Sequence, residues 1–559
     1  MLGIVSKVAQ FLRPPKPSVV SFTLAQRTSF YKHTTDRWLY NEDAQNSCRY
    51  VEFNVEELQR VACNAVGAKR CIGFVKLDEG SYNKIFALNF DNGSEALVRI
   101  PSKLVRPPFF STASEVATLE FAREVLDIPT PRVFAWNGHA DRNSVGVEYI
   151  IMERMQGVGL LERWLDVSGK EAVPIFDDAI KLETAFEAAP FASIGSLYFK
   201  EDVSSELQSM PLFTENDPSQ RDSPISQKLS WASKKYRIGP ITDRQWWRGE
   251  RLGMNTYRGP WPDFSSFLLG AIDLEHSWIS QYAGQNNSPS HRKAPYYDPS
   301  VHLHTLDMYS QVIPHIVPPP QLCTPMLWHP DLSLSNLLVA PSGPSNIIGV
   351  IDWQDAVIAP YIILAQFPTM FAYEGERIYI PPGSAIPELP KEFPSFLPEE
   401  QEAYRLDLKL AMRQKFYEIY ISRNKCRLEA CRYPLGSQIA MLPYYLLRSW
   451  TDSPAALRQL LLDIRDEWDN IATPGAACPI SFKDQEIKEH KVAYHRHNLY
   501  NRAVQKLNVE LGCIGDGAVP PEKYADSMKK LNTLRDSWDE KENGGPFPYC
   551  DGMFSFFLN

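Results

Sequence analysis

The sequence predicts an α+β fold of two lobes, a small antiparallel-sheet lobe followed by a large, mainly helical lobe. Before residue 153, short apolar runs of strand length alternate with turn residues, and one helical stretch interrupts them. After residue 153, apolar residues recur mainly at the three- and four-residue spacing of helices. The 559 residues, 44% of them hydrophobic, supply enough apolar material for an N-lobe at 36–155 and a C-lobe at 156–559.

The predicted N-lobe begins with a helix at 53–66, where the apolar residues share one helical face. The turn Asp91-Asn92-Gly93 is expected to join two of the strands as a hairpin. A second helix is expected at 115–126, with the Ser and Thr residues of 111–114 as candidate N-caps. The predicted strands are 71–77, 84–90, 96–100, 132–136 and 145–152.

The predicted C-lobe is a series of helices that includes an insert at 165–320. Two polar segments, 203–227 and 285–300, are predicted to be loops. The aromatic pair Trp246-Trp247 is expected to anchor the insert against the large lobe. The predicted helices are 176–189, 264–283, 303–316, 398–423, 437–449, 454–471, 482–511 and 521–540.

A strand hairpin in the C-lobe carries the most informative residues. Residues 329–336 read His-Pro-Asp-Leu-Ser-Leu-Ser-Asn and lead into an apolar strand at 337–339. A proline- and glycine-containing turn follows, and then a second strand at 346–351 that ends at Asp352. Because the two strands pair as a hairpin, Asp352 is expected to return to a place beside Asn336.

These residue types at this spacing are what a kinase-type phosphoryl transfer requires. Asp331 would accept the proton of an attacking hydroxyl, while Asn336 and Asp352 would bind the Mg²⁺ that holds the ATP phosphates. His329 lies two residues before Asp331, where a hydrogen bond could brace the loop. The alternative is an ordinary hairpin with solvated acids.

Composition excludes several classes of protein. The formal net charge is -9 and no basic stripe is present, so nucleic acid is not an expected partner. The nine cysteines are scattered without a Cys-x-x-Cys pair, which is typical of reduced thiols in an intracellular compartment. No run of eighteen apolar residues occurs, so we expect no transmembrane segment.

The first 35 residues have the composition of a mitochondrial transit peptide. They contain several Lys, Arg, Ser and Thr residues and no acidic residue, and residues 1–12 can form a short amphipathic helix. We therefore expect a mitochondrial location. The alternative is a disordered basic tail on a cytoplasmic protein.

The motifs resemble the two signatures of the aminoglycoside phosphotransferase family, which includes choline-kinase relatives. The Trp that follows Asp352 is characteristic of that family. Further segments are similar to one fungal branch, the altered inheritance of mitochondria protein 9 group: 37–42, 53–58, 79–86, 238–240 and 258–261.

This resemblance implies a bilobal protein-kinase-like fold, the cofactors ATP and Mg²⁺, and further site residues. Met152 and Glu153 would form the hinge, where backbone groups meet adenine. Glu115 would be the helix acid that pairs with the basic residue of the third strand, which here is Arg99.

Two positions depart from the family pattern. Arg99 stands where a kinase usually has Lys; it could clamp phosphates bidentately, be locked onto Glu115, or be a surface residue. The phosphate loop is poor in glycine, with Gly80 and Ser81 as its candidate phosphate-binding residues, and Glu79 would tend to repel phosphate. A plain hairpin turn is the alternative for this loop.

The predicted function is an ATP- and Mg²⁺-dependent phosphotransferase with a small-molecule hydroxyl as the acceptor. The rival is a catalytically weak or inactive kinase-like scaffold involved in mitochondrial maintenance, and protein-kinase activity is a lesser alternative. The oligomeric state stays open. Four acids of the insert could face a cationic acceptor or be solvated: Asp202, Glu206, Asp243 and Glu250.

Overall fold

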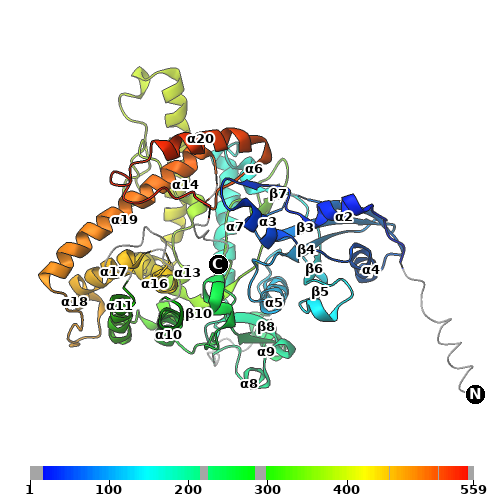
Figure 1. Cartoon of the computed structure of the whole chain (residues 1–559), viewed down its shortest axis with the longest axis horizontal. Coiled ribbons are helices and arrows are strands. Elements are labelled where there is room, and N and C mark those ends of the chain that lie inside the picture. Colours follow the sequence, from blue (N-terminus) through cyan, green and yellow to red (C-terminus); the bar gives the residue numbers. More distant parts are fainter. Residues whose placement is uncertain are drawn as a thin grey trace, which may run out of the picture.

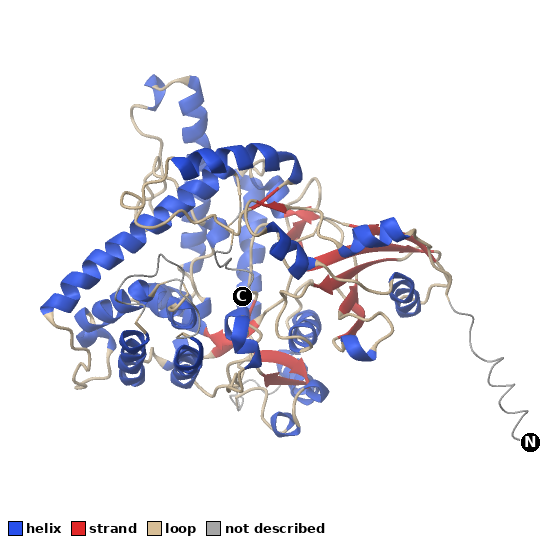
Figure 2. Cartoon of the chain, in the orientation of Figure 1, coloured by secondary structure: helices blue, strands red, loops and turns tan. Residues whose placement is uncertain are grey.

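The computed structural model describes residues 17–77, 79–214, 224–283, 298–451, 453–513 and 515–551. Within these ranges, an antiparallel sheet with its helices forms one lobe, and a larger, mostly helical lobe packs beside it (Figures 1 and 2). The predicted α+β fold of two lobes is confirmed. The helix predicted at 1–12 and most of the loop predicted at 285–300 lie outside the described residues.

The N-lobe is built on a five-stranded antiparallel sheet in the order β2-β3-β4-β6-β5. Its strands match the predicted ones to within two residues, except that β6 starts four residues later than position 145. Gly146 has a φ of 82° and turns the chain before the strand begins. The bounds are α2 (Leu24–Tyr31), β1 (Arg37–Trp38), α3 (Glu42–Arg49), α4 (Val55–Ala65), β2 (Cys71–Lys76), β3 (Asn83–Phe90), β4 (Glu95–Pro101), α5 (Phe110–Glu124), β5 (Val133–Asn137) and β6 (Tyr149–Met152).

Alternation along β3 and β4 gives the sheet two different faces. Phe86 and Val98 are paired across the strands and are fully buried against α2 and α4. Residues one position away point to the opposite face, where Asn83, Arg99 and Ile150 line a small pocket together with residues of α5. The sheet therefore presents an apolar face to its own helices and a polar face to the junction of the lobes.

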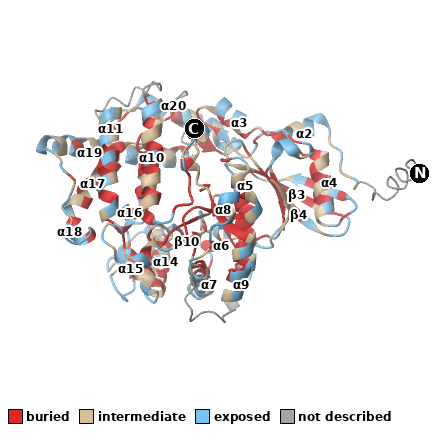
Figure 3. Ribbon diagram, turned by 90° about the horizontal axis from the view of Figure 1, so that it is seen from below, coloured by how far each residue is buried: buried red, intermediate tan, exposed pale blue. Residues whose placement is uncertain are grey.

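Helix α5 begins five residues before its predicted start. Phe109 has a φ of 64° and redirects the chain after Pro107-Pro108, so the helix starts at Phe110. The residues 111–114, predicted as N-caps, are inside the helix and buried. Nearly every side chain of α5 is buried, because the sheet covers one side and the β8–β9 hairpin covers another (Figure 3).

The first half of the C-lobe contains the insert. Trp246 is fully buried against Trp261 and Phe267, which belong to the insert itself. The prediction of a loop at 203–227 is wrong in part, since it holds α8 and the start of α9, while 215–223 are outside the described residues. The bounds are β7 (Val158–Gly159), α6 (Leu160–Trp164), α7 (Gly169–Glu187), β8 (Ser196–Phe199), α8 (Ser205–Gln208), α9 (Pro224–Lys235), β9 (Tyr236–Gly239), α10 (Phe264–Tyr282), α11 (Pro299–Val312) and α12 (Pro320–Cys323).

The second half of the C-lobe holds the predicted strand hairpin and the C-terminal helices. Strand β11 pairs antiparallel with β12, with Leu337 opposite Val350, as predicted. All five C-terminal helices predicted from periodicity are present, with a break after α17. The bounds are β10 (Pro325–Trp328), β11 (Leu337–Val339), β12 (Ile347–Val350), β13 (Val357–Pro360), α13 (Tyr361–Leu364), α14 (Pro398–Ile421), α15 (Lys425–Arg432), α16 (Gly436–Arg448), α17 (Pro454–Asp466), α18 (Trp468–Ile471), α19 (Asp484–Leu511), β14 (Ala518–Val519) and α20 (Tyr524–Asp536).

Segments from both ends of the chain meet on the N-lobe, which the sequence did not predict. Strand β1 pairs antiparallel with β14, and the Arg37 guanidinium of β1 lies over the ring of Tyr524, the first residue of α20. The Trp38 indole N–H donates to Asp516 Oδ2 over 3.1 Å, and the Arg49 guanidinium lies 3.5 Å from the same oxygen. Arg49 also donates to the carbonyl of Ser81, at 3.1 Å. The C-terminal segment thus holds the loop that precedes β3 through Arg49.

We expect Asp516→Ala to destabilise this junction, because it leaves the buried Arg49 guanidinium without a carboxylate and Trp38 without an acceptor. An unsatisfied buried polar group costs about 1–3 kcal/mol. The measurement is the thermal unfolding midpoint beside the control Asp536→Ala, which removes an exposed acid at the end of α20. Equal midpoints for the two variants would contradict this role of Asp516.

Candidate active site

Asp331 and Asn336 lie together in the turn between β10 and β11. The Asn336 amide nitrogen donates to the Asp331 carbonyl at 2.9 Å and to its carboxylate Oδ2 at 3.0 Å. Asn336 is buried, whereas Asp331 is exposed. The amide nitrogen therefore faces Asp331, and the carboxamide oxygen, which has no hydrogen-bond partner among the described residues, is available to a cation.

His329 connects this turn with the loop that follows β12. Its Nε2 lies 2.9 Å from the carbonyl of Ile351, and its Nδ1 accepts the backbone N–H of Asp331 at 3.2 Å. Burial lowers the pKa of His329, which favours the neutral ring that these two bonds require. The ring also packs edge-on against Trp353, with centroids 4.8 Å apart. His329 thus has a bracing position and does not face the open side of the site.

The loop after β12 turns sharply and presents Asp352. Both Asp352 and Asp355 have left-handed backbone conformations, with φ of 63° and 62°, which Asp tolerates better than most residues. Trp353 between them is fully buried, whereas the carboxylate of Asp352 is half exposed. The Ile351 backbone N–H donates to the carbonyl of Asn336 at 3.0 Å. Asp331, Asn336 and Asp352 therefore lie on two loops that are bonded to each other.

Arg99 joins the N-lobe to this loop. Its Nη1 donates to Glu115 of α5, and its Nη2 donates to Gln354 and lies 3.3 Å from Asp352 Oδ1. The sequence left three roles open for Arg99: a phosphate clamp, an ion pair with Glu115, or a surface residue. The structure shows the ion pair with Glu115. Burial raises the pKa of Glu115 to about 7, and the charge of Arg99 opposes this rise.

Gln354 is a site residue that sequence reasoning missed. Its side-chain oxygen accepts hydrogen bonds from Arg99 of β4 and, at 2.7 Å, from Asn83 of β3. One carboxamide therefore ties two strands of the N-lobe to the loop of Asp352. Its position two residues after Asp352 was the only feature of the sequence that could have indicated a place in the site.

The glycine-poor loop is exposed at Gly80 and Ser81. The expected repulsion by Glu79 is wrong, because this carboxylate is buried and paired with Lys84 at 2.6 Å and Lys76 at 2.7 Å. Lys84 lies on the helix-covered face of the sheet, where burial lowers its pKa to about 8. The carboxylate of Glu79 is therefore paired with two lysines in a buried position, and its charge does not oppose an anion at Gly80 and Ser81.

The predicted hinge residues lie at the end of β6, on the strand beside β4. Met152 is opposite Leu97 in the sheet. The Glu153 backbone N–H donates to the carbonyl of Arg132 at 2.8 Å, and its carboxylate accepts the Arg132 N–H at 3.1 Å. The Glu153 N–H is therefore already hydrogen-bonded within the protein, to the carbonyl of Arg132.

The four candidate acids of the insert have different environments. Glu206 is exposed, and Glu250 accepts the Trp278 indole N–H at 3.1 Å. Burial raises the pKa of Asp202 to about 6. Asp243 directly precedes Arg244, whose Nε lies 2.8 Å from Asp355 Oδ2, so it is the one of the four next to the site.

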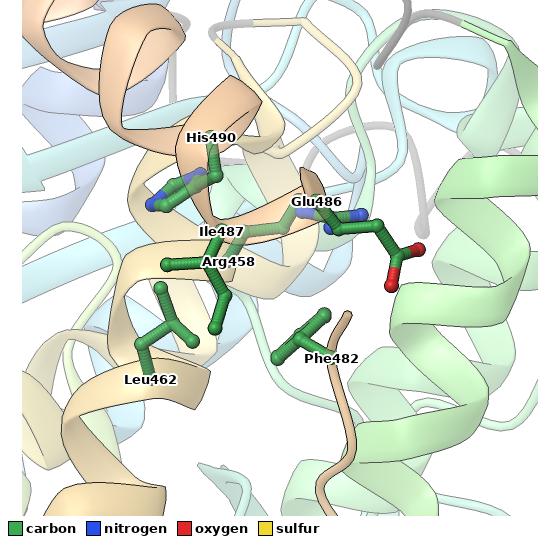
Figure 4. A pocket seen from close by; sticks show the side chains of 6 residues that line it. All are labelled: Arg458, Leu462, Phe482, Glu486, Ile487 and His490. Carbon is green, nitrogen blue, oxygen red and sulfur yellow. The ribbon is translucent and has the colours of Figure 1, made fainter. Parts of the chain in front are cut away.

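A pocket between α17 and α19 is separate from all these residues (Figure 4). Its polar groups serve packing, since His490 Nε2 lies 3.0 Å from Gln459 Oε1 and Arg458 lies over the ring of Phe482. Burial and the charge of Arg458 lower the pKa of His490 to about 4. Within the described ranges, no helix is both long and apolar enough to cross a membrane.

A strand cation paired with a buried helix carboxylate, next to an Asp–Asn–Asp set at the junction of two lobes, defines a protein of the kinase-like phosphotransferase class. The Phosphotransferase enzyme family agrees with this class: its model matches residues 285–363, which contain both loops of the site. The chain is also similar, along most of its length, to several fungal proteins.

A Subtelomeric hrmA-associated cluster protein of Aspergillus fumigatus is 30% identical over 523 residues, which cover 86% of this chain and 96% of the relative. Altered inheritance of mitochondria protein 9 of Clavispora lusitaniae is 22% identical, over 93% of this chain and 90% of its own. The solved aminoglycoside phosphotransferase APH(4)-Ia is 13% identical, with a TM-score of 0.31, over 70% of this chain and 98% of its own.

The chain therefore belongs to the aminoglycoside phosphotransferase family, in the fungal branch that includes altered inheritance of mitochondria protein 9. The resemblance predicted from the motifs is confirmed. Relatives in this branch carry the word mitochondrial in their names, in agreement with the predicted location.

We expect the ionisation of Asp355 to make the protein less stable as pH rises. Burial raises the pKa of Asp355 to about 7, while Arg244 and Arg99 oppose the rise and Asp243 and Asp352 add to it. The folded state then holds a proton that the unfolded chain releases near pH 4, so stability falls between about pH 4 and pH 7.

The measurement is the difference in unfolding midpoint between pH 5 and pH 8. In Asp355→Asn this difference should be smaller than in the wild type, whatever the absolute midpoints are. Asp273→Asn, on the exposed side of α10, is the control. An unchanged difference in Asp355→Asn would show that this carboxyl does not titrate in that range.

Proposed function

We propose that the chain is an ATP- and Mg²⁺-dependent phosphotransferase that acts on the hydroxyl of a small molecule. One observation carries this proposal: Asp331, Asn336 and Asp352 lie on two loops joined by the bond from the Ile351 N–H to the Asn336 carbonyl. A general base and two oxygen ligands on neighbouring loops are the groups that phosphoryl transfer from ATP requires.

The oxygen atoms present suit Mg²⁺. The Asn336 carboxamide oxygen and the half-exposed Asp352 carboxylate would bind it. The described residues contain no cluster of three or more His, Cys, Asp or Glu side chains that could hold a metal. One carboxamide oxygen and one carboxylate fit Mg²⁺, which is usually bound by one or two carboxylates together with substrate phosphates. Mg²⁺ would neutralise charge on the phosphates, and its binding should depend on the nucleotide.

Asp331 would act as the general base. Its Oδ2 is held by Asn336, which fixes the direction of the carboxylate. In the reaction, the acceptor oxygen bonds to the γ-phosphorus as the bond to the β–γ bridging oxygen breaks; the hydroxyl proton passes to Asp331, and ADP leaves. General-base catalysis of this kind contributes roughly 10²- to 10⁴-fold in rate.

A small-molecule acceptor is supported by the course of the chain after the site. Asp355 is followed at once by β13, which pairs with β10, so this part of the chain contains no long segment like a protein-kinase activation loop. The insert covers α5 with the β8–β9 hairpin and contacts the loop of Asp355 through Arg244. Asp243 is the acid of the insert best placed to meet a cationic acceptor.

A kinase-like binding protein without turnover is the second candidate. It is favoured by the engagement of Arg99 with Glu115, Gln354 and Asp352, which occupies the guanidinium that would otherwise hold phosphate. In either case we propose a mitochondrial location. A leader within the N-terminal segment would end before Ser18, because Ser18 bridges to Arg70 and α2 packs on the N-lobe.

We expect Asp331→Asn to bind Mg-ATP like the wild type and to lose at least 100-fold in ADP formation, because only the base is removed. Binding is measured as a thermal shift, which reaches about 2.7 kcal/mol at a hundred times the dissociation constant. Asp352→Asn should instead lose the part of the shift that depends on Mg²⁺. Asp273→Asn is again the control.

A wild type that shows a Mg-ATP shift but releases ADP no faster than Asp331→Asn would favour the binding protein. A wild type without any shift at millimolar Mg-ATP would contradict the phosphotransferase and favour a scaffold that does not bind the nucleotide.

A further inference from the structure

Arg99 is poorly placed to serve as the only cation of the phosphate site. Both terminal nitrogens of its guanidinium already contact partners: Nη1 donates to Glu115, and Nη2 meets Gln354 and Asp352. Only 6% of its side chain is exposed. A nucleotide tail carries several negative charges, so a second cation on the open side of the loop would be needed to bind it.

Four Lys and Arg side chains contact residues 79–84 in the described part of the chain, and three of them are at most 10% exposed. Lys76 and Lys84 both form ion pairs with Glu79, and their side chains are 10% and 2% exposed. Arg49 contacts Ser81 and Asp516, and its side chain is 2% exposed. Arg244 differs, because 36% of its side chain remains exposed.

Arg244 lies between the two loops that would hold a nucleotide tail. Its guanidinium carbon is 3.8 Å from the ring centroid of Tyr82, which directly follows Gly80 and Ser81. Its Nε is 2.8 Å from Asp355 Oδ2, three residues after Asp352. The Asp355 side chain is only 9% exposed and lies against the Nε edge of the guanidinium, while 36% of the Arg244 side chain remains exposed.

The insert holds Arg244 rigidly. Asp243 caps the short helix Arg244–Trp246 by accepting the Gln245 N–H at 2.9 Å. Trp246 is fully buried, and the Trp247 indole donates to the carbonyl of Ile241 at 2.6 Å. A guanidinium placed by a buried helix turn loses little conformational entropy when it binds an anion.

We propose that Arg244 binds the terminal phosphates of the nucleotide, so that the insert supplies the second cation of the phosphate site. This inference rests on the proposed function. The planar guanidinium can bind phosphate oxygens bidentately while Asp355 and Tyr82 keep its orientation. With this role of Arg244, the insert contributes to the active site as well as packing over α5.

The test compares a nucleotide with terminal phosphates and one without them, using the full chain and isothermal titration calorimetry. Arg244→Ala should bind ATP at least tenfold more weakly than the wild type, while its affinity for AMP changes less than twofold. Arg244→Lys should recover part of the loss, since it keeps the charge but not the fork. Arg248→Ala is the matched control, because Arg248 lies on the same segment but donates to Thr451.

Equal relative losses for ATP and AMP in Arg244→Ala, or no loss for either, would overturn the inference, as would an equal effect of Arg248→Ala. Should Arg244→Ala fail to fold, Arg244→Gln and Arg244→Lys give the same comparison. If the wild type binds no ATP, the proposed function fails as well; if it binds ATP and the Arg244 variants match it, only the role of Arg244 fails.

Discussion

The arrangement of the site depends on one buried guanidinium at the junction of the lobes. Arg99 sits on β4 and reaches Glu115 of α5, Gln354 and Asp352 at once. A buried charge is tolerated only when it is paired and hydrogen-bonded, so the strand, the helix and the loop must all be in place together. The position of the loop of Asp352 relative to the N-lobe follows from that requirement.

Carboxylates outnumber cations around this point. Asp331 lies on one loop of the hairpin and Asp352 and Asp355 lie on the other, and the guanidinium groups beside them are Arg99, near Asp352, and Arg244, near Asp355. Burial raises the pKa of Asp355, which reflects the cost of holding its charge there. An excess of oxygen ligands over cations is what a divalent cation would offset, while an anionic nucleotide tail would meet the two guanidinium groups. Both expectations rest on the same charge distribution.

The sequence predicted the parts of the site that are local in the chain. The five-residue spacing of Asp331 and Asn336 and the apolar run before Asp352 were enough to predict the hairpin and its two loops. The start of α5 was missed because a left-handed Phe109 has no sequence signal. Contacts of Arg244 with Asp355 and of Trp38 with Asp516 join distant segments, so neither periodicity nor motif spacing could predict them.

The most direct test of the account is the position of a bound metal. We expect crystals grown with Mn²⁺ and a non-hydrolysable ATP analogue to show an anomalous scattering peak within coordination distance of the Asn336 carboxamide oxygen and the Asp352 carboxylate, with the nucleotide between the lobes. A well-ordered nucleotide with its metal bound by other residues, or at another surface, would contradict the account.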